Sequence, residues 1–106
     1  MELSQLEPQI IWKNFSALNS VPRPSKKEEQ VIAFIKNFGE NLNLETTVDE
    51  VGNVIIKKPA TPGMENRKSI VLQSHLDMVC QKNNDIEFDF ETQGIQMEVD
   101  GDWVKA

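Results

Sequence analysis

The residues best suited to chemistry are His75, the single histidine of the chain, and Asp77, which follow an apolar run at residues 70–73. In an extended backbone, side chains two residues apart point to the same face, so the imidazole and the carboxylate would lie side by side. A metal-bound histidine commonly gives its second ring N–H to such a carboxylate, which orients the ring. The end of a strand is also where ligands bind in open α/β sheets. His-x-Asp is common by chance, however, and the spacing alone favours a structural or surface histidine over a metal ligand.

Other reactive or aromatic side chains have simpler structural explanations. Cys80 lies in an apolar run without a neighbouring base, so we expect a small buried side chain rather than a reactive thiol. Trp12 and Trp103 are expected to be packing anchors. Acidic residues alternate with apolar ones over 85–91, but the glycine and spacing of a calcium loop are missing. We therefore expect a solvated loop there.

Two helices are predicted in the first half of the chain. In residues 8–18, Ile11, Phe15 and Leu18 recur at the spacing of one helix face. The two prolines of residues 22–24 prevent this helix from continuing, because each lacks a backbone N–H.

The second helix is expected to begin at Ser25, because Ser25 and Glu28 match a capping box in which each side chain binds the other's backbone N–H. Glu28 and Glu29 are then interpreted as helix-start acids rather than a catalytic pair, since acids there complement the helix dipole. Gly39 marks a weak point or an early end of the helix. The predicted buried face consists of five apolar residues: Val31, Ile32, Ile35, Phe38 and Leu42.

Strand signals follow from position 44. Residues 46–48 and 54–56 are β-branched or apolar and flank Gly52-Asn53, which predicts two strands joined by a turn. Prolines and polar residues then predict a surface loop that runs to about Arg67.

The remaining strands define the expected fold. Residues 69–73 form a short apolar run, typical of a strand buried on both faces, and lead directly into His75. Residues 95–104 alternate apolar and polar residues around Asp100-Gly101, which predicts a hairpin with an Asp-Gly turn. The order of elements favours an α/β fold in which helices cover an open mixed sheet.

Length and charge limit the function further. The 106 residues are 39% hydrophobic and 26% charged, which suits one domain at most and excludes a two-domain enzyme with its own substrate cleft. A formal charge of -6 disfavours nucleic acid as a partner, because phosphate binding needs a positive face. One cysteine, no long apolar stretch and no signal peptide together predict a cytosolic protein outside the membrane. The chain stops inside the second arm of the last hairpin, so we expect a truncation at Ala106.

Several longer stretches carry a family signal. They are 49–67, Val71-Leu72-Gln73-Ser74-His75-Leu76-Asp77-Met78-Val79, Gln81-Lys82-Asn83, Ser20-Val21-Pro22-Arg23-Pro24-Ser25 and the closing Asp100-Gly101-Asp102-Trp103-Val104-Lys105-Ala106. Together with the wider segment from Leu3 to Glu29, they closely resemble the bacterial aminoacyl-histidine dipeptidases, cytosolic carnosine-hydrolysing peptidases of the zinc-dependent exopeptidase superfamily. The resemblance spans nearly the whole chain and concerns the N-terminal part of these enzymes. It implies that residues 1–106 are an incomplete part of one catalytic domain.

The resemblance also implies a role for each candidate residue. His75 corresponds to the first metal-ligand histidine, and Asp77 to the catalytic-site aspartate that holds its ring. The family uses a pair of Zn²⁺ ions, or other divalent ions such as Co²⁺ or Mn²⁺, with a bridging aspartate and a glutamate base that come after Ala106. Ser74 and Cys80 replace the Gly or Ala and the Pro that are common in the family, and neither change removes a ligand.

The implied activity is hydrolysis of dipeptides with a C-terminal histidine by a full-length protein, which is compatible with a homodimer. Because a catalytic zinc usually takes three protein ligands and His75 supplies one, we expect the 106-residue chain alone to bind zinc weakly and to be inactive. Two alternatives stay open. One is a short non-catalytic α/β binding or interaction module, and the other is a related di- or tripeptidase or acylamino-acid hydrolase of different specificity.

Overall fold

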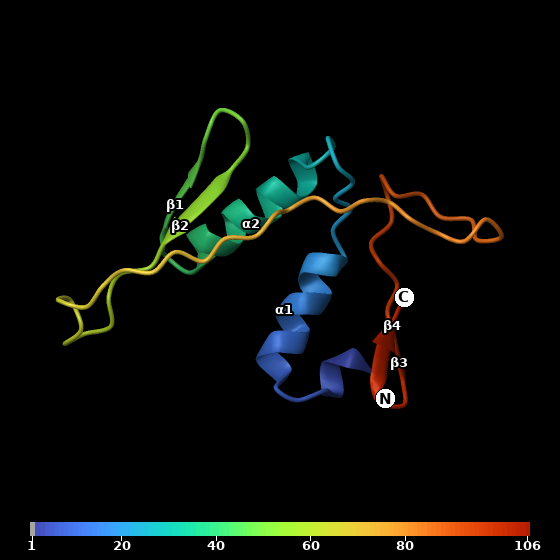
Figure 1. Ribbon diagram of the computed structural model, residues 1–106, viewed down its shortest axis with the longest axis horizontal. Coiled ribbons are helices and arrows are strands. Elements are labelled where there is room, and N and C mark those ends of the chain that lie inside the picture. Colours follow the sequence, from blue (N-terminus) through green and yellow to red (C-terminus); the bar gives the residue numbers. More distant parts are fainter. Residues whose placement is uncertain (1) are drawn as a thin grey trace. The chain divides into compact units, whose positions relative to one another are not determined.

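The computed structural model describes residues 2–106, which form short helices and strands joined by long irregular segments (Figure 1). In chain order the elements are the 3-10 helix η1 (Leu3–Gln5), α1 (Gln9–Asn19), α2 (Glu29–Asn41), β1 (Glu45–Val48), β2 (Val54–Lys57), β3 (Glu98–Asp100) and β4 (Trp103–Lys105). They divide into two compact units, residues 2–31 with 77–106 and residues 32–76, and the division falls inside α2.

Helix α1 forms as the apolar spacing predicts, to within one residue at each end. The indole of Trp12 meets Phe15 edge to face with 6.0 Å between ring centroids, and its N–H donates to the carbonyl of Glu7 at 3.3 Å. Both contacts suit an amphipathic aromatic side chain that is half-buried. The packing role predicted for Trp12 is therefore confirmed.

The hairpin at the end of the chain is also confirmed, with a turn one residue later than predicted. Strands β3 and β4 pair antiparallel with Asp100 opposite Trp103, so the turn residues are Gly101 and Asp102. Gly101 has a φ of 61°, and glycine at the first position of a two-residue turn is typical of type II′. The side chain of Trp103 is 77% exposed, so its predicted packing role is wrong within the described residues.

Asn19 joins α1 to the segment that precedes β3. Its carbonyl accepts from the N–H of Ile95 at 2.8 Å, and its side-chain amide donates to the sulfur of Met97 at 3.5 Å. Asn19 is only 3% exposed, and a buried amide needs such partners to offset the loss of water. It lies on the wall of a mostly apolar cavity of about 580 Å³, which is lined by Ile11, Trp12, Phe15, Asn19, Arg23, Met78, Ile95, Met97, Val104, Lys105 and Ala106.

The second unit contains the other predicted hairpin, β1 and β2, in antiparallel register with Thr46 opposite Ile56. Its turn is closed by Asp49, whose carboxylate accepts from the backbone N–H groups of Val51 and Asn53. Gly39 of α2 faces the hairpin, because a Cβ at this position would collide with the side chains of Thr46 and Ile56. The glycine thus permits the close approach of helix and hairpin. The helix does not end at Gly39 but continues to Asn41.

The start of the second helix was predicted wrongly. α2 begins at Glu29, and Lys26 has a φ of 70°, a left-handed conformation that cannot belong to a right-handed helix. The capping box is absent, because the Ser25 hydroxyl bonds elsewhere and Glu28 accepts from the N–H of Lys26 at 2.7 Å. Of the five residues predicted to be buried, Val31 is fully buried, Ile32 and Ile35 are half-buried, and Phe38 and Leu42 are exposed.

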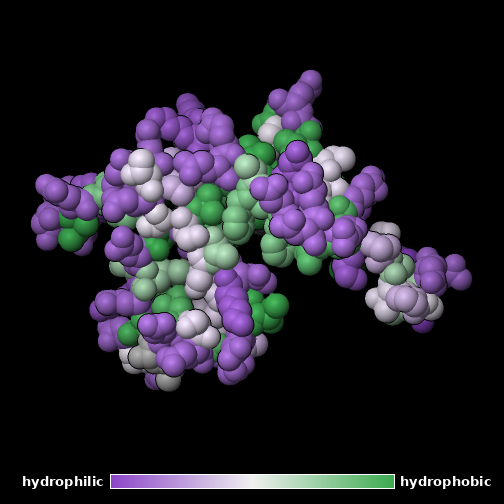
Figure 2. All heavy atoms as spheres, turned by 180° about the vertical axis from the view of Figure 1, so that it is seen from behind, coloured by the Kyte–Doolittle hydropathy of each residue, from purple (hydrophilic) through white to green (hydrophobic). Residues whose placement is uncertain are grey.

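The predicted strand at 69–73 and the single mixed sheet are not formed within the described residues. The four assigned strands make two separate two-stranded antiparallel sheets, and the segment before His75 pairs with none of them. Ile70, Val71 and Leu72 are 82–90% exposed. Figure 2 shows apolar residues, in green, reaching the surface among polar ones. Across residues 2–106, no helix has both the length and the apolar character needed to cross a membrane.

The acidic stretch 85–91 is a loop without regular structure, as predicted. It is anchored at one end, where Glu91 pairs with Lys27 and its carbonyl accepts from the side chain of Gln30 at 3.3 Å. The hydrogen bond to Glu91 raises the pKa of Lys27 above its usual value, so this lysine stays charged. Phe88 and Phe90 contact each other edge to face with 5.0 Å between centroids.

Candidate metal-binding site

His75 lies in the irregular segment that follows β2, close to the end of the second unit. Its side chain is exposed, as are the apolar residues just before it. Its role as a ligand, predicted from the sequence, stays a prediction.

Asp77 belongs to the first unit and is half-buried. Its Oδ2 accepts a hydrogen bond from the hydroxyl of Ser25 at 2.5 Å, across 52 positions of sequence. Hydrogen bonds between a hydroxyl and a carboxylate are short and about twice as strong as neutral ones. Ser25, which the sequence pattern predicted to cap a helix, therefore holds Asp77 in a defined orientation.

A short backbone pairing brings Ser25 to Asp77. Pro24 and Met78 form a parallel bridge, in which the N–H of Met78 donates to the carbonyl of Arg23 at 2.9 Å. The N–H of Ser25 in turn donates to the carbonyl of Met78 at 3.2 Å. These two bonds fix the register of residues 23–25 against residues 77–78. The backbone itself therefore places the Ser25 side chain beside Asp77.

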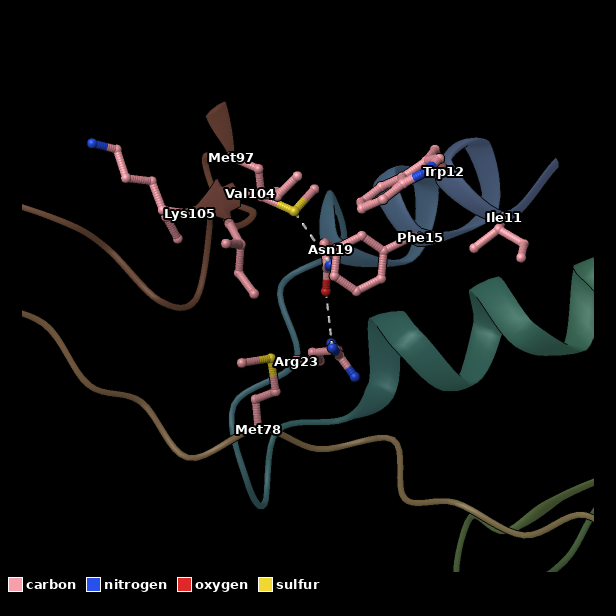
Figure 3. A pocket seen from close by; sticks show the side chains of 11 residues that line it. Ile11, Trp12, Phe15, Asn19, Arg23, Met78, Met97, Val104 and Lys105 are labelled. Atoms are coloured by element: carbon pink, nitrogen blue, oxygen red, sulfur yellow. Dashed lines mark hydrogen bonds between the residues drawn. The ribbon is translucent and has the colours of Figure 1, made fainter. Parts of the chain in front are cut away.

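Arg23 adds a positive charge to the surroundings of Asp77. Its Nη2 donates to the side-chain oxygen of Asn19 at 3.0 Å, and Figure 3 shows Asn19 between Arg23 and Met97 with a hydrogen bond to each. Burial lowers the pKa of Arg23, and the negative charge of Asp77 acts in the opposite direction. Even with a lowered pKa an arginine stays protonated at neutral pH, so Asp77 faces a permanent cation.

The described residues fit one metal-ligand position rather than a complete metal site. No three His, Cys, Asp or Glu side chains within residues 2–106 lie close enough together to hold an ion. A catalytic zinc usually takes three protein ligands, and His75 can supply one of them.

Cys80 differs from its prediction. The thiol is exposed rather than buried, and its sulfur lies 3.9 Å from the carbonyl of Met78. The apolar neighbours that suggested burial are exposed as well, since Val79 is 73% exposed.

Sequence reasoning missed Ser25, Arg23 and Asn19 as neighbours of the candidate site. Ser25 matched a helix cap, and the local pattern gives no sign of a partner 52 residues away. The one available signal was the run Ser20-Val21-Pro22-Arg23-Pro24-Ser25, which belongs to the stretches that resemble the dipeptidases but carried no assigned role.

The chain was compared with family models and with solved structures. No family model matches the chain. A solved structure, aminoacylhistidine dipeptidase from Vibrio alginolyticus, superposes on 98% of the chain with a TM-score of 0.93 and 47% sequence identity. At that identity and similarity, the two small sheets and two helices reproduce part of a dipeptidase fold.

A curated relative agrees with the structural match. The cytosol non-specific dipeptidase of Escherichia coli K12 is 52% identical over 105 residues, 99% of this chain. The chain spans about a fifth of either protein, 22% of the one and 21% of the other. Over nearly its whole length it is thus homologous to one part of these dipeptidases, and the family resemblance predicted from the sequence is confirmed.

Proposed function

We propose that the protein containing this chain is a metal-dependent dipeptidase of the cytosol, in which residues 1–106 are part of one catalytic domain. The observation that carries the proposal is the homology over 99% of the chain, with the fold retained at a TM-score of 0.93. The relatives are called dipeptidases, and one of them a cytosol dipeptidase. Their sites would include ligands that residues 2–106 do not provide.

Within such a site, His75 would bind one zinc through a ring nitrogen, and Asp77 would accept the hydrogen bond from the other ring N–H. When bound, zinc polarises the scissile carbonyl and makes a water molecule more acidic. The chain's own contribution is orientation. Asp77 fixes the tautomer of His75, and its negative charge makes the imidazole a better ligand.

We infer that the substrates are dipeptides, and that those with a C-terminal histidine, such as β-alanyl-histidine, are among them. One relative is named for aminoacylhistidine and the other as non-specific, so the breadth of the substrate range is the finer question. Neither name gives a reason to extend the proposal to tripeptides or acylamino acids, which stay as alternatives, as does a non-catalytic module.

The direct test is hydrolysis by the native polypeptide, purified and loaded with Zn²⁺, Co²⁺ or Mn²⁺ in parallel. We expect it to cleave β-alanyl-histidine and also dipeptides without histidine. The release of free amino acids measures the cleavage. Removal of the metal by a chelator should abolish cleavage, and readdition should restore it. Cleavage of neither substrate with any of the three metals, by a folded protein, would favour the non-catalytic module.

The 106-residue chain expressed alone is a matched comparison for the native polypeptide. We expect it to bind zinc weakly and to hydrolyse nothing, because His75 supplies one ligand of the usual three. Dipeptidase activity from a contaminant-free sample of this chain would contradict that ligand count.

A further inference from the structure

The contact between Ser25 and Asp77 is the feature of the described residues that the proposed function leaves unused. The hydroxyl donates to Oδ2 at 2.5 Å, and the same hydroxyl lies 3.4 Å from the carbonyl of Met78. The second contact is long, so the carboxylate is the main acceptor of this donor. The Ser25 hydroxyl, which was predicted to cap a helix, instead donates its hydrogen bond to the carboxylate of Asp77.

The backbone conformation places residue 25 in particular beside Asp77. The parallel bridge sets Ser25 opposite residues 77–78, and the left-handed conformation of Lys26 turns the chain away immediately afterwards. The N–H of Lys27 closes that turn on the carbonyl of Pro24 at 2.9 Å. A non-glycine residue in this conformation is uncommon and persists only where the surrounding structure requires it. The turn that ends the segment therefore leaves Ser25 as its last residue beside Asp77.

Arg23 and Asn19 continue the same network away from the carboxylate. Asn19 is 3% exposed and holds Nη2 of Arg23 at 3.0 Å, while Arg23 acts on Asp77 through its charge. The carboxylate thus has a fixed hydrogen-bond donor from Ser25 and a cation tied to a buried amide. The hydrogen bond from Ser25 and the charge of Arg23 both belong to the first unit, and all of their residues are described by the structure.

We propose that Ser25 is a positioning residue of the metal site, whose hydroxyl holds the carboxylate of Asp77 in the orientation that Asp77 needs to direct the ring of His75. This inference rests on the proposed function, since it assumes that His75 binds a metal. An ionised carboxylate has two oxygens with about four acceptor sites, so it can accept a bond from a hydroxyl and a bond from an imidazole N–H at the same time. The role of Ser25 is exerted through Asp77 and not by contact with substrate.

The test uses the native polypeptide and three variants, each stripped of metal and titrated with Zn²⁺ against a chromophoric chelator. We expect Ser25→Ala to bind zinc about tenfold more weakly, at the lower end of the range seen for partners of ligating histidines. Ser25→Thr keeps the hydroxyl and should restore the affinity. Ser20→Ala is the matched control, because the Ser20 hydroxyl bonds to the carbonyl of Ala17 at 2.7 Å in the same segment, and it should bind zinc normally.

A double-mutant cycle with Asp77→Asn separates a positioning role from a merely structural one. If Ser25 acts through Asp77, Ser25→Ala should weaken zinc binding in the native background and change nothing further in the Asp77→Asn background. The absorption spectrum of the Co²⁺-substituted protein gives a second measure, since a rotated ligand alters the coordination geometry. Should Ser25→Ala fail to fold, Ser25→Cys keeps the size and a weaker donor, and replaces it in the same cycle.

The outcomes distinguish this inference from the proposed function. Normal zinc affinity and an unchanged cobalt spectrum in folded Ser25→Ala, with affinity lost in His75→Ala, would overturn the role of Ser25 alone. Additive losses in the cycle would also overturn it, because Ser25 would then act independently of Asp77. Normal zinc affinity in His75→Ala would overturn the proposed function itself, together with the role of Ser25.

Discussion

The two halves of the candidate site differ in what holds them. Asp77 lies in the first unit, where Ser25, Arg23 and a parallel bridge fix its surroundings through contacts between distant parts of the chain. His75 lies in the second unit, after an apolar segment that is 82–90% exposed and pairs with no strand of residues 2–106. The surroundings of Asp77 are thus fixed by contacts within residues 2–106. The segment that leads into His75 is exposed and has no strand pairing among the same residues.

The difference accords with the size of the relatives. Apolar runs such as 70–72 are stabilised by burial, at roughly 25 cal/mol for each Å² removed from water. The related dipeptidases are nearly five times as long as the matched segment, since it spans 21–22% of them. If the chain is part of a larger catalytic domain, as we propose, the rest of that domain would cover this run.

The largest effect is expected from His75→Ala. Loss of the imidazole removes a metal ligand, so zinc affinity and dipeptide hydrolysis should both fall by more than the roughly 10–100-fold typical of outer partners. Metal content after dialysis and kcat/KM on β-alanyl-histidine measure the two losses, and circular dichroism checks folding. A folded variant with native metal content would break the comparison, because the two halves would no longer form one site.

Asp77→Asn should have the next largest effect. The amide keeps the shape and one acceptor oxygen, but it loses the second acceptor oxygen and the charge that strengthens the histidine ligand. We expect zinc affinity or kcat to fall roughly 10–100-fold with the fold intact. Kinetics indistinguishable from the native protein would show that Asp77 has no orienting role, however well Ser25 holds it.

A core substitution tests whether the first unit is anchored as the structure indicates. Val31 is fully buried, whereas Val51 is 78% exposed in the turn between β1 and β2. Val31→Ala should lower the free energy of unfolding by about 2 kcal/mol, through lost burial and the cavity that remains. Val51→Ala should change it by less than about 0.5 kcal/mol, as for other surface positions. Urea titration measures both, and equal losses would contradict the assigned burial.

The smallest effect concerns the pH dependence of the second unit. Hydrogen bonds from the side chain and backbone of Asn53 lower the pKa of Asp49 below its usual value. A lowered folded-state pKa stabilises the hairpin above the ordinary pKa of aspartate, and the stabilisation is lost as the pH falls through the lowered value. Asn53→Ala should bring the pKa of Asp49 back toward its usual range, as measured by NMR titration of the carboxyl carbon. An unchanged titration curve would refute the assigned cause.

Local signals predicted most of the secondary structure. The apolar spacing of 8–18 gave α1, and the glycine-containing turns gave both hairpins, because these patterns depend on residues close together in the sequence. The resemblance to the dipeptidases was likewise carried by contiguous stretches, and the homology confirms it.

Nonlocal contacts account for the errors. Ser25 matched a helix cap, but a carboxylate 52 residues away competes successfully for its hydroxyl. Ile70, Val71, Leu72, Cys80 and Trp103 were predicted to be buried but are exposed, because an apolar pattern does not specify which distant residues pack on it. Arg23 and Asn19 were not predicted as part of the site, since their relation to Asp77 exists only in the folded chain.

Diffraction from zinc-loaded crystals of the native polypeptide at the zinc absorption edge can show whether Ser25 holds Asp77 so that Asp77 orients a zinc-binding His75. We expect an anomalous peak at roughly 2.0–2.1 Å from one ring nitrogen of His75. The other ring nitrogen should donate to Asp77, whose Oδ2 still accepts from Ser25. Zinc bound elsewhere, with His75 outside its coordination sphere, would show that His75 is not a ligand and that Ser25 and Asp77 do not position one.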